Sequence, residues 1–267
     1  MTAPPASAAS AAPAPPGAPG TIPAAALIVP DWPAPPGIRA LVTTRDGGVS
    51  SGAHRSLNLG TRAGDDPLSV AENRRRLDAM LPAPARWLQQ VHGNRAVAAH
   101  EIDQPPPADA SFTDRAHTVC TVMIADCMPV LLCSDDGRWV GAAHCGWRGL
   151  VGGAIESTLA GIGVDAQRMI AWLGPAIGPT AFEVGADVRD AFLAVDRSDD
   201  IAFMPSPTLP GKWYADLFTL GRRRLSRAGV TRVHGGGLCT VADPARFFSY
   251  RRDGITGRMA ALVWRDA

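Results

Sequence analysis

The sequence predicts a single α/β domain of mixed α and β structure, with mostly antiparallel and mixed strands flanked by helices. Of its 267 residues, 46% are hydrophobic and 19% are charged, which is enough apolar material for a buried core. Short runs rich in β-branched and apolar residues follow one another between Gly, Pro and Asp, while helical patterns lie before and after them. Most links between these runs are too short for a parallel crossover, so antiparallel pairing is expected.

Residues 1–36 are predicted to form a disordered Ala/Pro-rich tail, and residues 37–267 the folded domain. The tail holds 11 of the 24 prolines and 12 alanines, a composition that favours extended conformers over a core. It lacks the basic region and long apolar run of a secretory signal, and no apolar stretch of the chain is long enough for a membrane span. The five cysteines lack the spacing of a disulfide framework, so a cytoplasmic location is expected.

The elements of the domain are predicted from local patterns. A strand is expected over residues 38–43 and a helix over 67–80, with Asp65 and Asp66 at its capped start and Val70, Leu77 and Met80 on its buried face. Further strands are predicted at residues 87–91, 95–100, 118–124, 128–133, 139–143 and 230–234, and further helices at 149–160, 186–193 and 215–228. A final hairpin is predicted to turn at residues 253–254, between strands at 247–250 and 258–264.

The charge balance limits the kinds of partner. Lys and Arg number 26 and Asp and Glu 25, which gives a formal net charge of +1. Binding through phosphate neutralisation needs an excess of basic residues, so nucleic acid is not an expected partner, and neither is a membrane. The proline-rich tail is interpreted as a spacer, and no obligate protein partner is predicted.

Three segments place a soft or imidazole ligand where a predicted strand meets a turn. They contain His92 (residues 90–94), Cys127 (125–129) and His144 (143–149). Two imidazoles and one thiolate are a ligand set that catalytic Zn²⁺ uses, with a fourth position open to water or substrate. The alternative is that each residue is structural, because free cysteines and single histidines are commonly buried core residues.

The turn after His144 suggests a second site. The sequence Gly146-Trp147-Arg148-Gly149 leads from a strand into a helix expected to begin near Gly149, and a helix start offers unpaired N–H groups to anions. The planar guanidinium of Arg148 suits a phosphate or carboxylate. The alternative is a surface arginine on a tight turn with Trp147 as a core anchor.

The chain resembles the YfiH family, also called the laccase-domain or polyphenol-oxidase family. The resemblance rests on nine segments in order and covers nearly all of the chain after the tail. They are TTRDGGVS at 43–50, SLNLG at 56–60, GDD at 64–66, ENR at 72–74, QVHG at 90–93, ADCMP at 125–129, AHCGWRG at 143–149, GPAIGP at 174–179 and FSYRRDG at 248–254. The resemblance implies a single domain whose fold is shared with bacterial cysteine-dependent (CNF-type) toxins, with zinc ligands at His92, Cys127 and His144.

The resemblance also implies an activity. Family members are described as phosphorolysing adenosine, inosine, guanosine and 5′-methylthioadenosine, and as deaminating adenosine, so purine nucleosides and inorganic phosphate are the expected small-molecule partners. Two departures are Cys145, where alanine is usual, and residues 180–182, which replace a stretch richer in Cys and Tyr. Because a second thiolate beside His144 is able to compete for the metal, Cys145 puts the ligand set in question.

The chemistry assigns roles to the remaining polar residues. Zn²⁺ lowers the pKa of bound water from about 15.7 to about 7 in favourable sites, which suits deamination, and Asp126 or a nearby carboxylate would shuttle the proton. Phosphorolysis needs phosphate held beneath a cationic ribosyl centre, a role expected of Arg148 and Arg45. Asn58 and Arg251 are further expected substrate-binding residues, although each of these polar side chains has a structural alternative as a loop cap or a bridge between strands.

Other functions would use the same residues. A single copper ion at two His and one Cys would give weak phenol oxidation, so Cu²⁺ is a possible occupant, but a multicopper laccase needs far more histidines than the six present. A metal-free hydrolase would use Cys127 as nucleophile and His144 as base on an amide or a cell-wall precursor. A non-enzymatic metal-buffering or partner-binding module is the third alternative.

Overall fold

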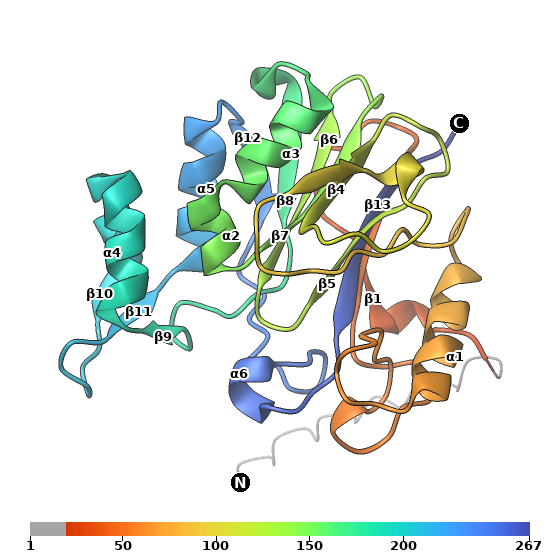
Figure 1. Ribbon diagram of the computed structural model, residues 1–267, viewed down its shortest axis with the longest axis horizontal. Helices are drawn as coiled ribbons and strands as arrows, with labels where there is room; N and C mark the ends of the chain where they lie inside the picture. The colour runs from red at the N-terminus through yellow and green to blue at the C-terminus, as the bar shows by residue number, and fades with distance from the viewer. Residues whose placement is uncertain (1–19) are drawn as a thin grey trace, which may run out of the picture.

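The computed structural model describes residues 20–267, which form two β-sheets packed face to face with helices on both outer sides (Figure 1). The mixed six-stranded sheet has β12 and β3 paired in parallel at its two edges and antiparallel pairs between β8, β6, β7 and β4. Its order is β12 (Arg232–Gly235), β8 (Met169–Leu173), β6 (Met128–Ser134), β7 (Val140–Cys145), β4 (Ala110–Thr113) and β3 (Ala96–Ala98). The four-stranded sheet is antiparallel throughout, in the order β1 (Leu27–Ile28), β2 (Ile38–Thr43), β13 (Met259–Arg265) and β5 (Cys120–Ile124).

Strand alternation divides the core into layers. Along β6, Val130 and Leu132 face the helices, whereas Leu131 and Cys133 face the four-stranded sheet. Both sets are fully buried, as expected for a strand covered on two sides. A third apolar layer lies between β13 and α1 (Pro67–Asp78), so the four-stranded sheet is covered on both faces as well.

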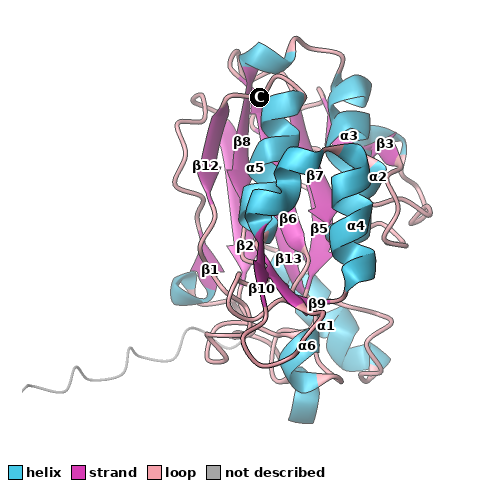
Figure 2. Ribbon diagram, turned by 90° about the vertical axis from the view of Figure 1, so that its left-hand side faces the viewer, coloured by secondary structure: helices cyan, strands magenta, loops and turns pink. Residues whose placement is uncertain are grey.

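Helices cover the outer face of the six-stranded sheet (Figure 2). The helices are α2 (Trp147–Gly152), α3 (Ala154–Ile162), α4 (Ala186–Val195) and α5 (Leu217–Arg227), with a small sheet in the order β10 (Phe203–Pro205), β11 (Trp213–Ala215) and β9 (Glu183–Val184) beside α4. The remaining elements are α6 (Tyr250–Asp253) and the 3₁₀ turns η1 (Ala24–Ala26), η2 (Gly52–His54), η3 (Ala99–Glu101), η4 (Ala166–Arg168) and η5 (Arg197–Ala202).

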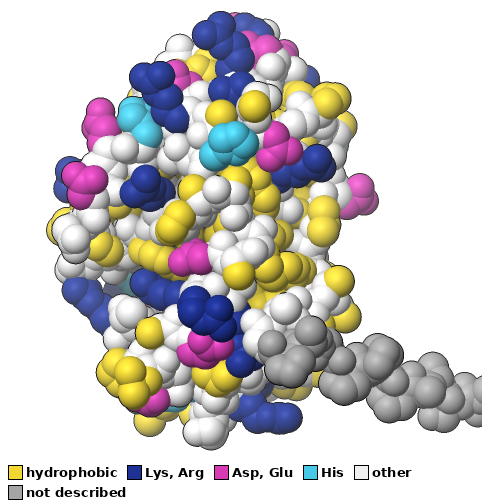
Figure 3. All heavy atoms as spheres, turned by 90° about the vertical axis from the view of Figure 1, so that its right-hand side faces the viewer, with side chains coloured by type: hydrophobic (Ala, Val, Ile, Leu, Met, Phe, Trp, Pro, Cys, Tyr) yellow, Lys and Arg dark blue, Asp and Glu magenta, His cyan; other side chains and the backbone are white. Residues whose placement is uncertain are grey.

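Figure 3 shows basic and acidic side chains interspersed on one face of the molecule.

The predicted mixed α/β fold is confirmed, and helix capping explains two of its helices. Asp66 caps α1 by accepting N–H groups from Leu68 and Ser69, at 3.2 and 3.1 Å, with Pro67 at the first helical position. Asp216 caps α5 in the same way. No helix among residues 20–267 combines the length and apolar character that crossing a membrane requires.

The predicted boundary of the tail is too late. Residues 1–19 lie outside the described part of the chain, but β1 pairs with β2, and Ile22 and Ala26 are buried against β13 and α1. Leu27, Ile28 and Trp32 also pack against the core, so the second half of the proline-rich segment is anchored, although its average composition predicts none of this.

Three predicted elements are wrong in detail. Instead of a hairpin strand, residues 250–253 form α6, because Ser249 caps the turn and the Asp126 carboxylate accepts the N–H of Arg251. The helix predicted at 149–160 is two helices, broken at Gly153, where φ is +87°. Residues 87–91 hold one isolated bridge, at Gln89, instead of a strand, and a second bridge lies just before them at Arg86. Met80, expected on the buried face of the first helix, is exposed because α1 ends at Asp78.

Candidate metal centre

His92, Cys127 and His144 lie together at one end of the sheets. Cys127 sits in the tight turn between β5 and β6, His144 is near the end of β7, and His92 lies in the loop before β3. One ligand atom from each residue lies within 4.8 Å of the other two, and the two imidazole rings meet edge to face with centroids 4.9 Å apart. The convergence proposed from the three turn segments is therefore present in the fold.

A buried carboxylate, Asp109, holds the ring of His144 and the backbone of His92. Its Oδ1 lies 2.9 Å from Nδ1 of His144 and accepts the N–H of His92 at 2.9 Å, and its Oδ2 accepts the N–H groups of Val91 and Gly93 at 3.1 and 2.7 Å. These bonds fix the loop in which His92 adopts φ +60°, and they leave Nε2 of His144 free to bind a metal.

The electrostatics of the cluster favour a thiolate. Burial raises the pKa of the Cys127 thiol, but the charges and hydrogen bonds of His144 and His92 outweigh burial and lower it below its usual value. For His144, burial lowers the pKa, while the Cys127 thiolate and Asp109 raise it by more. A thiolate is the form of cysteine that binds metal.

Gly146 makes room for the sulfur. A Cβ at this position would lie 2.8 Å from Sγ of Cys127 and 3.7 Å from Cδ2 of His92. A side chain at residue 146 would therefore displace the thiolate or fill the space between the ligands.

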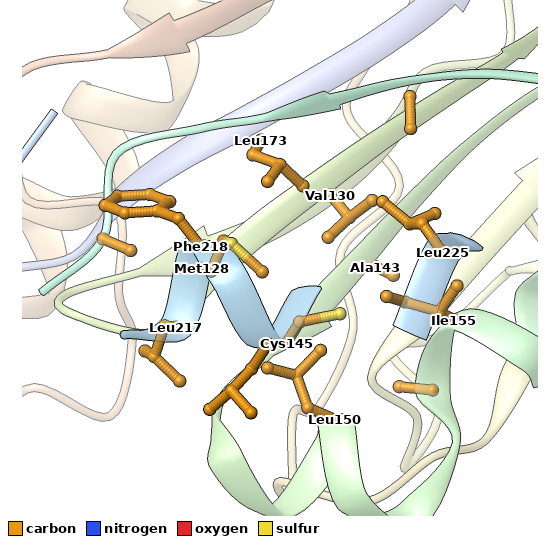
Figure 4. Close-up of a cluster of buried hydrophobic side chains, with 14 of the residues drawn as sticks. Met128, Val130, Ala143, Cys145, Leu150, Ile155, Leu173, Leu217, Phe218 and Leu225 are labelled. Carbon is orange, nitrogen blue, oxygen red and sulfur yellow. The ribbon is translucent and has the colours of Figure 1, made fainter. Parts of the chain in front are cut away.

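Cys145 points away from the cluster. Adjacent residues of a strand face opposite sides of the sheet, and Cys145 packs in the core with Leu150, Leu217 and Met128 (Figure 4). Burial raises its pKa far above the usual range for a thiol. The doubt that Cys145 raised about the ligand set has no support in the fold, since its side chain packs on the helix-covered face of β7.

The cluster opens into a cavity of about 850 Å³. Aromatic side chains from distant segments line its walls, namely Trp87, Trp147, Phe182 and Tyr250. This size is within the usual range for small-molecule sites, which are mostly apolar with a few placed polar groups.

Comparisons with known proteins identify the family. The family model described as multi-copper polyphenol oxidoreductase laccase matches residues 39–266. A Pseudomonas aeruginosa protein named purine nucleoside phosphorylase PA4543 is 52% identical over 239 residues, which cover 90% of this chain and 98% of the relative. An Escherichia coli K12 protein named purine nucleoside phosphorylase YfiH is 48% identical over 241 residues, covering 89% and 98%. The chain belongs to the YfiH family.

Solved structures agree with the YfiH fold. Neisseria meningitidis protein NMB0706 is 48% identical and superimposes with a TM-score of 0.88, covering 91% of this chain and all of the other. A Bacillus licheniformis protein titled hypothetical protein YfiH is 27% identical, with a TM-score of 0.79 over 86% of this chain and 93% of that one.

The donor set of this YfiH-family chain fits a divalent transition metal. Nε2 of His144, the Cys127 thiolate and a ring nitrogen of His92 would be the ligands, and the cavity adjoins them on one side. Zn²⁺ accepts this set with one position open, and Cu²⁺ also binds two imidazoles and a thiolate.

The other predicted site residues are scattered. Arg251 lines the cavity. Arg148 is exposed and stacks on the Trp147 ring at 4.3 Å, and α2 begins at Trp147, two residues before the expected start. Arg45 donates to the backbone carbonyls of Arg55 and Pro244.

Asn58 and Asp126 have mainly structural contacts. Asn58 is fully buried, bridging Asp65, Gly60 and Arg258 by hydrogen bonds. Arg45, Asn58 and Arg148 are absent from the cavity lining, so we keep Arg251 alone as a candidate substrate-binding residue from this set. Both oxygens of Asp126 are occupied, by the hydroxyl of Thr240 and the N–H of Arg251, which argues against the expected proton shuttle.

Sequence reasoning missed four residues of the site. Asp109 follows a run of three prolines, which is typical of a loop. It is brought to the metal ligands only because the strand that follows it, β4, pairs with β7. Arg62, Arg74 and Arg258 also line the cavity, but nothing in their local sequence distinguishes them from the other arginines.

Proposed function

We propose that this chain is a zinc-dependent purine nucleoside phosphorylase acting on adenosine, inosine, guanosine and 5′-methylthioadenosine, and that it also deaminates adenosine. The observation that carries the proposal is the His92–Cys127–His144 cluster at the edge of a nucleoside-sized cavity, in a chain about half identical to proteins named purine nucleoside phosphorylase. We also propose a cytoplasmic location, supported by the five free cysteines.

The cavity suits a purine nucleoside. Trp87, Phe182 and Tyr250 provide flat apolar surfaces against which a purine base can stack, and Arg251 lies over the Phe182 ring at 5.3 Å. Arg251 donates to the carbonyl of Glu183 at 2.9 Å and keeps its other N–H groups for substrate.

In phosphorolysis the bond between ribose C1′ and purine N9 breaks and a phosphate oxygen forms the new bond to C1′. The purine leaves with the electron pair of the broken bond and takes up a proton. Because positive charge develops on the ribose and negative charge on the base, fixed polar groups around the bond lower the barrier. A zinc ion at the three ligands would supply a Lewis acid beside the substrate.

The chain's own residues prepare this site. Asp109 holds the ring of His144, Gly146 leaves space for the Cys127 thiolate, and the apolar walls exclude water from the reacting bond. In the proposed deamination, water adds at C6 of adenosine and ammonia leaves, which requires no phosphate.

Product analysis tests the proposal. Purified protein is incubated with each of the four nucleosides, with and without phosphate, and the products are separated by chromatography. Only with phosphate do we expect free base and ribose 1-phosphate, or 5-methylthioribose 1-phosphate from 5′-methylthioadenosine. Inosine is expected from adenosine in either condition. No product from any nucleoside at micromolar enzyme would refute both activities, and free base with ribose would show hydrolysis instead.

The arrangement of Asp109, His144 and Cys127 favours a second candidate, a metal-free cysteine hydrolase. A buried carboxylate orients an imidazole next to a thiolate, as in cysteine–histidine catalytic pairs with a third orienting group. His92, the third side chain of the cluster, has no place in such a triad. One zinc per chain after purification without added metal supports the phosphorylase, whereas active metal-free protein that is inactivated by alkylation of Cys127 supports the hydrolase.

Copper-dependent phenol oxidation is testable in the same preparation. Residues 20–267 include all six histidines of the chain. They contain one cluster of three metal-ligating side chains. Protein loaded with Cu²⁺ is therefore expected to oxidise phenols weakly at most, measured as oxygen consumption.

A further inference from the structure

The cavity has an excess of positive charge. Four arginines line it (Arg62, Arg74, Arg251 and Arg258), against a single carboxylate, Asp126, whose two oxygens are already occupied by Thr240 and by the backbone of Arg251. Several arginines outside the cavity pair with acids, as Arg227 does with Asp199. None of the four cavity arginines has an ion-pair partner within residues 20–267, although the chain as a whole is nearly neutral.

Arg74 and Arg258 are the two partly buried members of this set. Burial lowers the pKa of Arg74 to about 10 and also lowers the pKa of Arg258, whereas exposed Arg62 and Arg251 remain in contact with water. Asp78 partly offsets this effect at Arg74, and Cys127 and Asp126 partly offset it at Arg258, but no carboxylate of residues 20–267 forms an ion pair with either guanidinium. A half-buried cation without a contacting carboxylate is costly, so an anion bound at this wall would stabilise both arginines.

Backbone contacts fix these two guanidinium groups and leave donors free. Arg74 stacks on the Trp87 ring at 3.9 Å and donates Nε–H to the carbonyl of Leu59 at 2.9 Å. Arg258 donates through Nη1 to the carbonyls of Thr256 and Gly257, at 2.8 and 2.9 Å. Among residues 20–267, the Nε and Nη2 edge of Arg258 and Nη1 of Arg74 have no hydrogen-bond partner. The free edge of Arg258 is the fork that binds an oxyanion through two parallel bonds.

The loop at residues 58–60 brings the two arginines to one wall. Asn58 Oδ1 accepts the N–H groups of Arg258 at 2.8 Å and of Gly60 at 2.9 Å, and Leu59 donates to the carbonyl of Arg258 at 3.0 Å. A Cβ on Gly60 would lie 2.6 Å from Cγ of Arg258, so the glycine lets the arginine side chain cross the loop. Donors held in this way bind an anion without a large ordering cost.

We propose that Arg258 and Arg74 form the orthophosphate subsite of the cavity. The inference rests on the proposed function, which requires phosphate as co-substrate, and it replaces Arg148 and Arg45 in that role. Arg258 and Cys127 line the same cavity, so phosphate bound at Arg258 would share that cavity with the metal ligands and the nucleoside. A phosphoryl group carried on the substrate has the same oxygens, and the experiment distinguishes the two sources.

The test compares Arg258→Gln and Arg74→Gln with a matched control, Arg138→Gln. Arg138 is an exposed arginine without an ion pair in the β6–β7 turn, and its side chain makes no contact with the cavity. For each zinc-loaded protein, calorimetry measures the binding of inorganic phosphate alone and of adenosine 5′-monophosphate, and kinetics measures KM for phosphate and for inosine. Metal analysis and circular dichroism confirm that each variant is loaded and folded.

We expect Arg258→Gln to raise Kd and KM for phosphate about 10- to 100-fold, with KM for inosine nearly unchanged, because a charge-assisted bidentate contact is lost. Arg258→Lys is expected to recover part of the affinity, since it restores the charge but not the fork. Arg138→Gln is expected to behave as the wild type.

Two results overturn the inference. The first is unchanged phosphate binding and KM in both Arg258→Gln and Arg74→Gln; the second is a loss confined to adenosine 5′-monophosphate, which would assign the subsite to a phosphoryl group on the substrate. A protein that binds phosphate through Arg258 but does not phosphorolyse any nucleoside would support the subsite. The same result would refute the proposed function. If Arg258→Gln does not fold, Arg74→Gln decides the question.

Discussion

Replacing Asp109 with asparagine removes one acceptor from the centre of the candidate metal site. The carboxylate receives four hydrogen bonds, from the backbone of Val91, His92 and Gly93 and from Nδ1 of His144. An amide of the same shape has one acceptor oxygen and one NH₂ donor, so it cannot satisfy both sides.

Either orientation of the amide is unfavourable. With NH₂ in the place of Oδ2, the N–H groups of Val91 and Gly93 face another donor and lose their acceptor. The cost is about 2–4 kcal/mol of folding free energy. With NH₂ in the place of Oδ1, the amide faces the N–H of His92 and also points at Nδ1 of His144. Nδ1 must then accept, so the ring proton moves to Nε2, the atom available for the metal. Loss of such an orienting partner typically weakens metal binding by about 10–100-fold.

Zinc competition against a chromophoric chelator measures the affinity, and urea denaturation of the metal-free protein measures stability. Asp114→Asn is the matched control, because Asp114 is a partly exposed carboxylate that follows β4, and its change is expected to stay within about 0.5 kcal/mol. Wild-type zinc affinity in Asp109→Asn would show that Asp109 does not position the ligands.

Three further predictions concern neighbouring residues. Gly146→Ala is expected to weaken zinc binding, because its Cβ would lie 2.8 Å from the Cys127 sulfur, whereas Gly152→Ala, with no atom nearer than 3.8 Å, should bind normally; the chelator assay compares them. Cys145→Ala should keep zinc and turnover and lose about 1 kcal/mol of stability, whereas loss of the metal would place its sulfur among the ligands. Hydrogen bonds from Ser50 and Asn58 overcome burial and lower the pKa of Asp65 below its usual 3.8. Its charged form therefore stabilises the fold above about pH 4, and urea titrations should show the stability difference from Asp65→Asn vanishing as the pH falls through the lowered pKa; a difference that persists at pH 2 would contradict this.

Local signals in the sequence predict much of the fold. Strands β5, β6 and β7 are apolar runs bounded by turn residues, and α1 and α5 carry capped, periodic patterns. The same turns predict the metal cluster, because His92, Cys127 and His144 each stand where a run ends. The toxin-like kinship of the fold stays a prediction.

Contacts between distant segments cannot be predicted in this way. Asp109 becomes a site residue only because β4 pairs with β7, and α6 replaces a hairpin strand because Asp126 accepts the N–H of a residue 125 positions away. Of 26 basic residues all but Lys212 are arginine, so which of them line the cavity depends on tertiary packing alone.

The central claim is that His92, Cys127 and His144 hold one divalent metal ion at the cavity. Its most direct test is metal analysis of protein purified without added metal, together with anomalous diffraction at the zinc edge. The account predicts one zinc per chain, with an anomalous peak bonded to all three side chains, and no zinc in Cys127→Ala. A metal-free protein that retains full phosphorolysis, or a peak bonded to other residues, would contradict it.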